Sequence, residues 1–346
     1  MGRYTLFAGM TLMLSVLFAA VSCSSSPMLT KATGLAYEVV VVMDKAVWDG
    51  AAGESVKADL RSDVPGLPQI EPSLKITYVE PEHFDNFLRY VRNILVVKIN
   101  PDVYTKVSVS VEKDKWARGQ VVLAMNAPDQ QAIVDFLTQH KNVLSNRYVK
   151  EEIQRAVDFL RSEYSPVVMS HVKSKFGYEL NAPATITSYK DTTDFFWASN
   201  NAGTGRLDIV VYSFPYVDKE TFTKDYLVAK RDSMMKQHMP GAFPNSYMQT
   251  EKKAEISYTP ITLNGTYCGE MRGLWSMVGD MMGGPFVSHT VLDEKNQRVI
   301  VAEGFVYAPE TDKRNFIRRV EAALFTLRPE GTEISGDVFG LSSNKE

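Results

Sequence analysis

The sequence lacks the short motifs that mark the common enzyme classes. It contains no HExxH, no Walker loop, no GxSxG elbow and no CxxC pair. Its five histidines lie far apart, and none has a second histidine or cysteine at the spacing of metal ligands: His83, His140, His171, His238 and His289. We therefore expect neither a metal site nor a bound cofactor.

An excess of charge of either sign is also missing. The chain has 38 lysines and arginines against 41 aspartates and glutamates, and no long run of one sign. This balance argues against a nucleic-acid partner and against a polybasic membrane patch. Because 45% of the 346 residues are hydrophobic, the chain can bury a sizeable core, and two domains are expected at this length.

Cysteine is scarce as well, and the first of the two copies, Cys23, closes an apolar N-terminal segment. A basic residue precedes an apolar run at residues 6–21, and serines follow at residues 24–26 where a membrane span would have basic residues. This pattern resembles the bacterial lipobox. We expect a signal peptide at residues 1–22, cleavage before Cys23, and lipidation of its thiol, which would hold the chain permanently at a membrane.

The second cysteine, Cys268, then has no partner within the chain. With Cys23 lipidated, no intramolecular disulfide can form, so the fold must be stabilised by packing alone. A lone buried thiol more often behaves as a small apolar side chain than as a nucleophile.

Strand and helix patterns alternate in the first half of the chain. Apolar runs predict strands at 37–43, 74–79 and 94–99, and strict alternation predicts a hairpin formed by 107–111 and 120–125. Helical spacing predicts helices at 44–60, 82–92, 129–140 and 147–164. A further helix has Ser165 as its N-cap, Pro166 at its first position and Gly177 just after its end.

The last third of the chain is rich in strands. Strands are predicted at 184–189, 194–199, 206–214, 246–251, 255–263, 266–277, 286–292 and 298–307. Helices at 219–237 and 311–324 interrupt and close the series. Asn264-Gly265 predicts a two-residue hairpin turn, because both positions tolerate a positive φ.

Together these patterns predict an α+β fold with a two-part body. Residues 23–36 are expected to form a flexible tether, and residues 37–180 a mixed α/β domain with a helical connector. Residues 181–328 are expected to form an antiparallel sheet with helices on one face, followed by a disordered tail at 329–346. The final strand and helix have a faint topological likeness to the Mog1/PsbP fold.

Five short segments of the second half carry a family resemblance: RDS at 231–233, MPG at 239–241, SYMQTE at 246–251, RGLW at 272–275 and MGGPF at 282–286. With these segments the chain resembles an uncharacterised family of Bacteroides-type lipoproteins, the domain of unknown function 4837. No activity is assigned to that family, so the resemblance implies no catalytic residues. It implies an outer-membrane lipoprotein, and the lack of acidic residues at 24–28 favours the periplasmic side.

The most promising polar residues lie on the last predicted strands. Alternation in 266–277 places Glu270 and Arg272 on the face opposite the core-facing side chains. His289 and Glu303 occupy interior positions of the next two strands. If these strands are neighbours, the polar groups could line a cleft in which a carboxylate and an imidazole act as acid and base. The alternative, which we favour, is a set of ordinary cross-strand ion pairs.

A methionine-bearing segment at 276–286 offers a second candidate site. Met281 and Met282 precede a Gly-Gly-Pro turn, and adaptable methionine side chains can contact a lipid or a partner protein. Alternatively, they fold back onto the core from a long hairpin. Arg272, Met281 and Met282 are therefore candidate ligand contacts.

Two functions are compatible with these observations. The first is a non-enzymatic binding or scaffold lipoprotein at the periplasmic face of the outer membrane, with an envelope protein, a glycan or a lipid as partner. The second is an envelope hydrolase that uses Glu270, His289 and Glu303. A deep cleft holding these three residues together would favour the hydrolase, and their dispersal would favour the binding protein.

Overall fold

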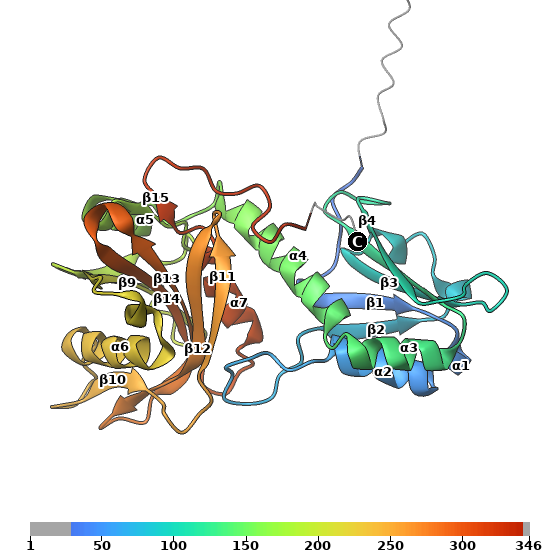
Figure 1. Cartoon of the computed structure of the whole chain (residues 1–346), viewed down its shortest axis with the longest axis horizontal. Coiled ribbons are helices and arrows are strands. Elements are labelled where there is room, and N and C mark those ends of the chain that lie inside the picture. Colours follow the sequence, from blue (N-terminus) through green and yellow to red (C-terminus); the bar gives the residue numbers. More distant parts are fainter. Residues whose placement is uncertain (1–28, 342–346) are drawn as a thin grey trace, which may run out of the picture.

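The computed structural model describes residues 29–341 and has two domains joined by a long helix (Figure 1). Both domains combine helices and strands, which confirms the predicted α+β fold with a two-part body. Cys23, the expected signal peptide at 1–22 and residues 342–346 lie outside the described residues. None of the helices within 29–341 combines the length and the apolar character needed to span a bilayer.

The N-terminal domain contains a five-stranded sheet with helices packed on one face. Its strands are β1 (Glu38–Val42), β2 (Lys75–Val79), β3 (Asn93–Ile99), β4 (Ser108–Lys113) and β5 (Val121–Ala127). Its helices are α1 (Lys45–Trp48), α2 (Ala51–Leu60), α3 (Gln130–Gln139) and α4 (Val143–Leu160). The strand order is β2-β1-β3-β5-β4, and all pairs are parallel except the predicted β4–β5 hairpin.

The helix expected at 82–92 does not form. Two short 3₁₀ turns, Pro81–His83 and Leu88–Tyr90, take its place. The Asp85 carboxylate accepts hydrogen bonds from the backbone N–H of Phe87 (2.9 Å) and Leu88 (3.1 Å). Such local side-chain bonds compete with the regular helical ladder. The segment instead covers the sheet face that α2, α3 and α4 leave free.

The C-terminal domain contains an eight-stranded antiparallel sheet of order β10-β12-β13-β14-β9-β8-β7, with β11 paired to the other end of β12. Its strands are β7 (Ser188–Thr192), β8 (Phe195–Ser199), β9 (Arg206–Pro215), β10 (Tyr247–Thr250), β11 (Ser257–Leu263), β12 (Thr266–Val278), β13 (Gly283–Asp293) and β14 (Arg298–Tyr307). The helices are α5 (Pro166–Phe176), α6 (Lys224–His238) and α7 (Arg314–Leu324), and β6 (Tyr178–Glu179) pairs with β15 (Arg328–Pro329).

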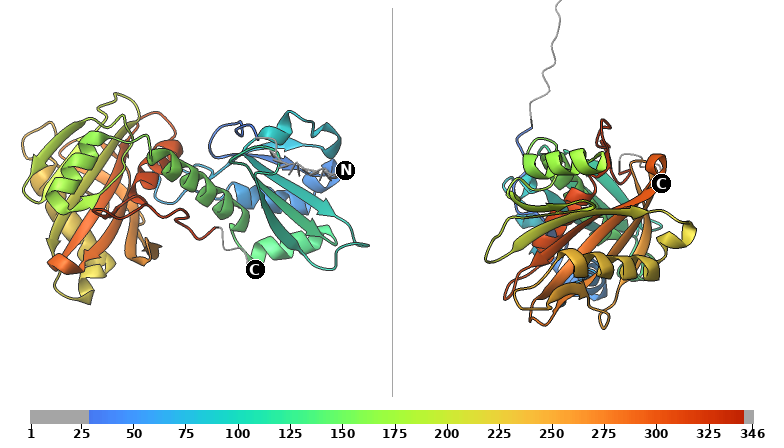
Figure 2. Two further views of the ribbon diagram at one scale, coloured as in Figure 1. Left: turned by 90° about the horizontal axis from the view of Figure 1, so that it is seen from above. Right: turned by 90° about the vertical axis from the view of Figure 1, so that its left-hand side faces the viewer.

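Helices cover both faces of this sheet, whereas the sequence predicted helices on one face. Helix α6 packs on one side, and α5 and α7 pack on the other (Figure 2). The reason lies in β14, whose side chains are apolar on both faces of the strand. Val299 and Val301 join the core beneath α6, and Ile300 and Ala302 join the core beneath α7. A strand that is apolar on both faces has to be covered on both.

The predicted start and end of α5 and the predicted β11–β12 turn are confirmed. The Ser165 side chain accepts a hydrogen bond from the Val168 N–H, and Gly177 adopts φ +65°. Asn264 and Gly265 have φ of +50° and +78°, as a two-residue hairpin turn requires. Helix α5 packs against β6 and β8, so it belongs with the C-terminal domain and not with residues 37–180 as expected.

The tail is ordered from residue 329 to residue 341, so the expected disorder is wrong for that stretch. Strand β15 is part of it, and the Arg161 guanidinium donates to the Ile334 carbonyl at 3.1 Å. Ile334 and Leu341 are buried, and Phe339 packs against Phe325 at 4.7 Å between ring centroids. These scattered apolar residues show no periodicity, yet their segment lies against α4 and against Phe325, which follows α7.

Residues 29–36, expected as the end of a flexible tether, are also held in place. The Ala32 N–H donates to the Arg118 carbonyl at 2.9 Å, and the Thr33 N–H donates to the Tyr90 carbonyl at 2.8 Å. The segment therefore runs along the N-terminal domain before it enters β1. Residues 23–28 of the expected tether lie outside the described residues.

Candidate functional site

Strand β12 separates polar from apolar side chains, as its alternation predicts. Met271 and Trp275 join the core beneath α6, while Glu270 and Arg272 lie on the face beneath α7. Cys268 shares that second face and is fully buried. Burial raises the pKa of its thiol far above the usual range. The thiol therefore stays protonated and is no nucleophile.

Glu270, Arg272 and His289 meet side chains of α7 in one ion-pair network, which we call the β12–α7 cluster. Arg272 Nε donates to Glu270 Oε1 at 2.8 Å, and its Nη2 donates to Glu321 Oε1. Arg318 Nη1 donates to Glu321 Oε2 at 2.8 Å. His289 Nε2 lies 3.2 Å from Glu270 Oε2. Two guanidinium groups thus balance two carboxylates within the cluster.

The electrostatics of the cluster do not suit acid–base catalysis. Burial alone would raise the pKa of Glu270, but the Arg272 guanidinium and the His289 imidazole outweigh it and hold this pKa well below its usual range. Glu270 is therefore a permanent carboxylate at neutral pH. The His289 ring is fully buried, with its edge against Phe325 at 4.8 Å between centroids. A buried imidazole of this kind has no access to a substrate.

Glu303 lies apart from this cluster, on the opposite face of the sheet. It accepts two hydrogen bonds from Arg231 of α6, from Nη2 at 2.7 Å and from Nε at 2.8 Å, and both side chains are fully buried. Arg231 also donates to Thr250 Oγ1 at 3.0 Å. Burial raises the pKa of Glu303, and the Arg231 guanidinium opposes this effect. The four polar residues considered together in the sequence are thus divided between two faces.

Four members of the β12–α7 cluster, Glu270, Arg272, Arg318 and Glu321, line a cleft of about 1020 Å³ between the two domains, whereas the buried His289 does not. Asn146 and Lys150 of α4 and Asp337 and Phe339 of the ordered tail also line this cleft. The charged groups of the cluster are bonded to one another, so they act mainly as a structural joint between β12 and α7.

The two methionines occupy different environments in the β12–β13 turn. Met281 is fully exposed, with 101% of its reference surface accessible. Met282 packs against the core beneath α6. The turn therefore contains one exposed methionine and one that folds back onto the core.

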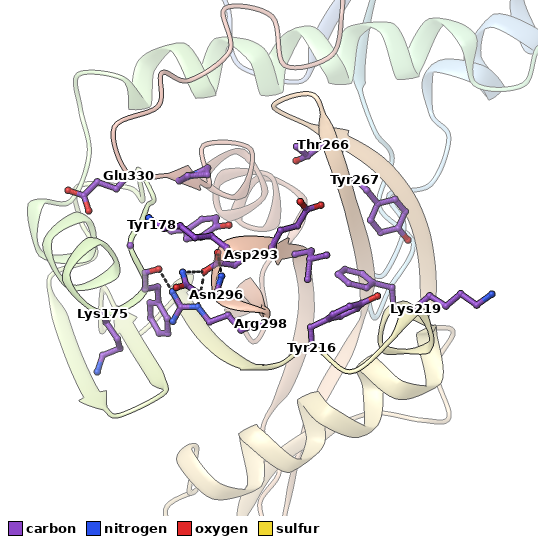
Figure 3. Close-up of a pocket in the computed structure, with 17 residues that line it drawn as sticks. Lys175, Tyr178, Tyr216, Lys219, Thr266, Tyr267, Asp293, Asn296, Arg298 and Glu330 are labelled. Atoms are coloured by element: carbon purple, nitrogen blue, oxygen red, sulfur yellow. Dashed lines mark hydrogen bonds and ion pairs between the residues drawn. The ribbon is translucent and has the colours of Figure 1, made fainter.

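A second cleft, of about 1050 Å³, lies at one end of the C-terminal sheet (Figure 3). We call it the aromatic cleft. Tyr178, Asp293, Asn296 and Arg298 lie on one side, and Tyr216, Tyr267 and Lys219 lie on the other (Figure 3). Further lining residues are Lys175, Phe176, Gly177, Phe222, Thr266, Leu292, Glu294, Lys295, Pro329 and Glu330.

The polar side of the aromatic cleft is held rigidly. Arg298 Nε and Asn296 Nδ2 both donate to Asp293 Oδ2 at 2.8 Å, and Arg298 Nη2 donates to the Phe176 carbonyl at 2.6 Å. Burial would raise the pKa of Asp293, but Asn296 and Arg298 outweigh it, so this pKa is lowered. Burial raises the pKa of Tyr178 to about 12, which keeps its phenol neutral and able to donate a hydrogen bond.

The opposite side of the aromatic cleft is formed by aromatic rings. The rings of Phe222 and Tyr267 form a T-shaped pair at 5.5 Å between centroids, and the Phe222 ring lies 6.2 Å from that of Tyr216. The hydroxyl groups of Tyr258 and Tyr267 are 2.8 Å apart. Tyr267 remains 50% exposed. The ring is thus fixed by its neighbours while one side stays open to a ligand.

Sequence reasoning did not find the aromatic cleft. Its rings come from four separate places in the chain, at the ends of different elements: Tyr178, Tyr216, Phe222 and Tyr267. No local spacing connects them. The one available signal is compositional, because sixteen tyrosines are present and several lie at strand ends.

Within residues 29–341, no group of three or more His, Cys, Asp or Glu side chains is arranged to hold a metal ion. The clefts of this part of the chain offer side-chain hydrogen bonds, charges and aromatic rings.

Comparisons with known proteins give families without an assigned function. Residues 32–161 match a domain of unknown function, DUF8532, and residues 165–326 match another, DUF4837. A crystal structure from Bacteroides thetaiotaomicron VPI-5482, at 1.50 Å resolution, aligns with 14% identity and a TM-score of 0.24. The alignment covers 45% of this chain and 47% of that one, so it spans about half of that protein. No curated protein matches the chain.

The two matched regions coincide with the two domains of the structure. The boundary between them falls between the end of α4 and the start of α5. The resemblance seen in the segments at 231–233, 272–275 and 282–286 is confirmed, because all three lie within the region that matches DUF4837, and a region that matches DUF8532 precedes it.

Proposed function

We propose that this protein is a lipid-anchored, non-enzymatic binding protein of the cell envelope, and that it binds a saccharide in the aromatic cleft. The observation that carries the proposal is the arrangement of the cleft. The half-exposed ring of Tyr267 and its neighbour Tyr216 lie across from the polar groups Asn296 and Arg298.

This arrangement matches the two kinds of surface of a sugar ring. The C–H faces of a pyranose are apolar and pack well on aromatic rings, whereas its hydroxyl groups need directional hydrogen bonds. Tyr267 and Tyr216 offer the first kind of contact, and the Tyr178 hydroxyl, Asn296 and Arg298 offer the second. A concave site with apolar walls and a few fixed polar groups is the usual form of a small-molecule site.

The positions of the acidic residues and of the histidine favour binding over catalysis. Glu270 and His289 bond to each other and lie beneath α7, while Glu303 pairs with Arg231 on the other face. A general acid and base have to reach one substrate from the same cavity. The alternative function, an envelope hydrolase acting through these three residues, is therefore less well supported.

The expected location completes the proposal. Cys23 would carry the lipid, and the mature chain would be held at the outer membrane on its periplasmic side. An anchored protein of this kind meets envelope glycans at a high local concentration, so a modest affinity for a sugar would suffice.

Titration calorimetry with soluble glucose and N-acetylglucosamine oligomers, and with an acidic uronic-acid oligomer, tests the saccharide proposal. The wild-type protein should bind at least one of them. Tyr267→Ala should weaken that binding about tenfold, since an aromatic contact is worth on the order of 1 kcal/mol beyond its buried area. Phe159→Ala removes an exposed ring outside the cleft and serves as the matched control.

Two results would contradict this proposal. One is a wild-type protein that binds none of the oligomers. The other is release of shorter sugars during the titration, because cleavage of the oligomer would show a hydrolase.

A further inference from the structure

Four large apolar side chains remain exposed where the described chain enters the N-terminal domain. They are Leu29 (38% exposed), Leu35 (69%), Phe87 (84%) and Tyr90 (42%). We call them the entry patch. Exposed apolar residues are ordinary when they are scattered singly, but a group of them marks a contact surface.

The residues of the entry patch come from two segments that lie side by side. The Thr33 N–H donates to the Tyr90 carbonyl at 2.8 Å, and the Arg92 N–H donates to the Thr33 carbonyl at 2.9 Å. These bonds form a parallel bridge between Thr33 and Val91. The entry segment with Leu29 and Leu35 is thereby fastened to the segment that carries Phe87 and Tyr90.

The fold itself keeps the entry patch exposed. The 80–92 segment packs its inner side on the sheet, where Phe84 meets Trp116 edge-on at 5.9 Å between centroids. The Asp85 carboxylate accepts from the backbone N–H of Phe87 and holds the turn that directs this ring outward. Phe87 is thus presented by an ordered turn above an apolar layer.

We propose that the entry patch is a membrane-contact surface, whose rings lie in the interfacial region of the leaflet that holds Cys23. The inference rests on the lipid anchor of the proposed function. Six residue steps separate Cys23 from Leu29, and an extended chain of that length reaches at most about 20 Å. The entry patch therefore stays next to the leaflet, and aromatic side chains such as Tyr90 and Phe87 favour that interface.

Charge does not drive this contact. Lys31 and Arg89 belong to the two segments of the entry patch and Arg118 bonds to residues 30 and 32, but Glu82 and Asp85 belong to the same segment as Phe87. A mixture of this kind gives little attraction to anionic lipid. Contact through apolar rings should consequently depend little on salt concentration, in contrast to binding through a basic patch.

Contact at the entry patch would also orient the whole molecule. The two domains lie at opposite ends of the long axis (Figure 1). With the N-terminal domain against the leaflet, the C-terminal domain and its aromatic cleft remain accessible to a ligand in the aqueous space.

A quenching experiment on the tethered protein tests this inference. The mature chain is purified without acylation and coupled through the Cys23 thiol to a maleimide-headgroup lipid. The vesicles consist of phosphatidylethanolamine and phosphatidylglycerol with brominated acyl chains. Cys268 is buried and does not compete for the maleimide. Bromine quenches tryptophan fluorescence on close approach, so Phe87→Trp should lose more fluorescence than the parent protein.

Val217→Trp is the matched control, because Val217 is 72% exposed but lies in the C-terminal domain. Its added fluorescence should not be quenched. Adding Leu35→Asp to Phe87→Trp should reduce the quenching, and 0.5 M salt should not. Equal quenching of the Phe87→Trp and Val217→Trp proteins would overturn the inference. Because the coupling is chemical, this result is independent of whether cells lipidate Cys23, which acyl labelling decides separately.

Discussion

Glu303 lies opposite Ser288 in the β13–β14 ladder, whereas His289 lies opposite Ala302. Because successive side chains of a strand point to opposite faces, Glu303 and His289 lie on opposite faces of the same sheet. Glu303 faces Arg231 of α6, and His289 faces Phe325 after α7. Groups that a sheet separates in this way cannot act on one substrate, and each instead stabilises the packing of its own side.

Replacing Glu303 with Gln should destabilise the protein strongly. The change leaves the Arg231 guanidinium buried without a counter-charge, and breaking a buried pair in this way costs about 3 to 5 kcal/mol. Urea unfolding measures the loss. The double variant Arg231→Met/Glu303→Leu should recover much of it, because no charge then remains buried. Lys45→Met, which removes an exposed pair with Asp49, should leave the unfolding midpoint nearly unchanged.

His289→Gln should leave both folding and function largely intact. Glutamine can still donate a hydrogen bond to Glu270, and no substrate reaches this position. Complementation of a deletion strain, with the amount of anchored protein measured in parallel, tests the expectation. A stable and correctly anchored His289→Gln protein that fails to complement would favour the hydrolase hypothesis.

The β12–α7 cluster should make stability depend on acidity. The pKa of Glu270 is lower in the folded protein than in the unfolded chain, where it is about 4.3. The unfolded state therefore binds the proton first, so the stabilising contribution is complete above about pH 4.3 and is lost as the pH falls towards the folded pKa. Thermal melts between pH 7 and pH 3 should show a smaller acid-dependent loss for Glu270→Gln than for the wild type. Parallel curves for the two proteins would contradict the role of Glu270.

Substitution of Gly177 or Gly265 should lower the stability of the protein through backbone strain alone. Both have a positive φ, and a Cβ at either position would meet no atom within 4 Å. Valine at either position should therefore cost on the order of 1 to 3 kcal/mol through strain. Gly203 has equally open surroundings without a positive φ, so Gly203→Val is the matched control. Melting temperatures equal to that of the control would show that the left-handed backbone is unimportant.

Cys23→Ala should abolish acyl labelling and leave an uncleaved precursor or a soluble form, because no other group in the segment can form the thioether. Membrane fractionation with a labelled fatty acid measures both outcomes. Cys268→Ala provides the control, since its buried thiol should never be acylated. Unchanged labelling of the Cys23→Ala protein would rule out the anchor.

Much of the C-terminal domain was predictable from the sequence because its signals are local. Alternation along β12 separates Met271 from Glu270, and the Asn264-Gly265 pair tolerates the positive φ of its turn. The cap at Ser165 and the end at Gly177 were predictable for the same reason. Side-chain chemistry within a few residues is enough to specify these features.

The segment at 82–92 shows where local reasoning was insufficient. Its apolar residues have helical spacing, but Phe84 packs inward while Phe87 remains exposed. The Asp85 bonds and the need to cover the open face of the first sheet outweigh the helical pattern. The same holds for the tail, because Ile334 is buried in a core formed by residues far away in the sequence.

The sequence by itself determined the order of the elements, the polar and apolar faces of single strands, and the position of Cys23 at the end of an apolar N-terminal segment. Only the tertiary structure decided which of those faces meet. The register of the β13–β14 pair places Glu303 and His289 on opposite faces of the sheet. The tertiary fold brings Tyr178, Tyr216 and Tyr267, which are far apart in the sequence, to one cleft. The physical reason is that periodicity is a property of neighbours along the chain, whereas register and packing depend on contacts between residues far apart in it.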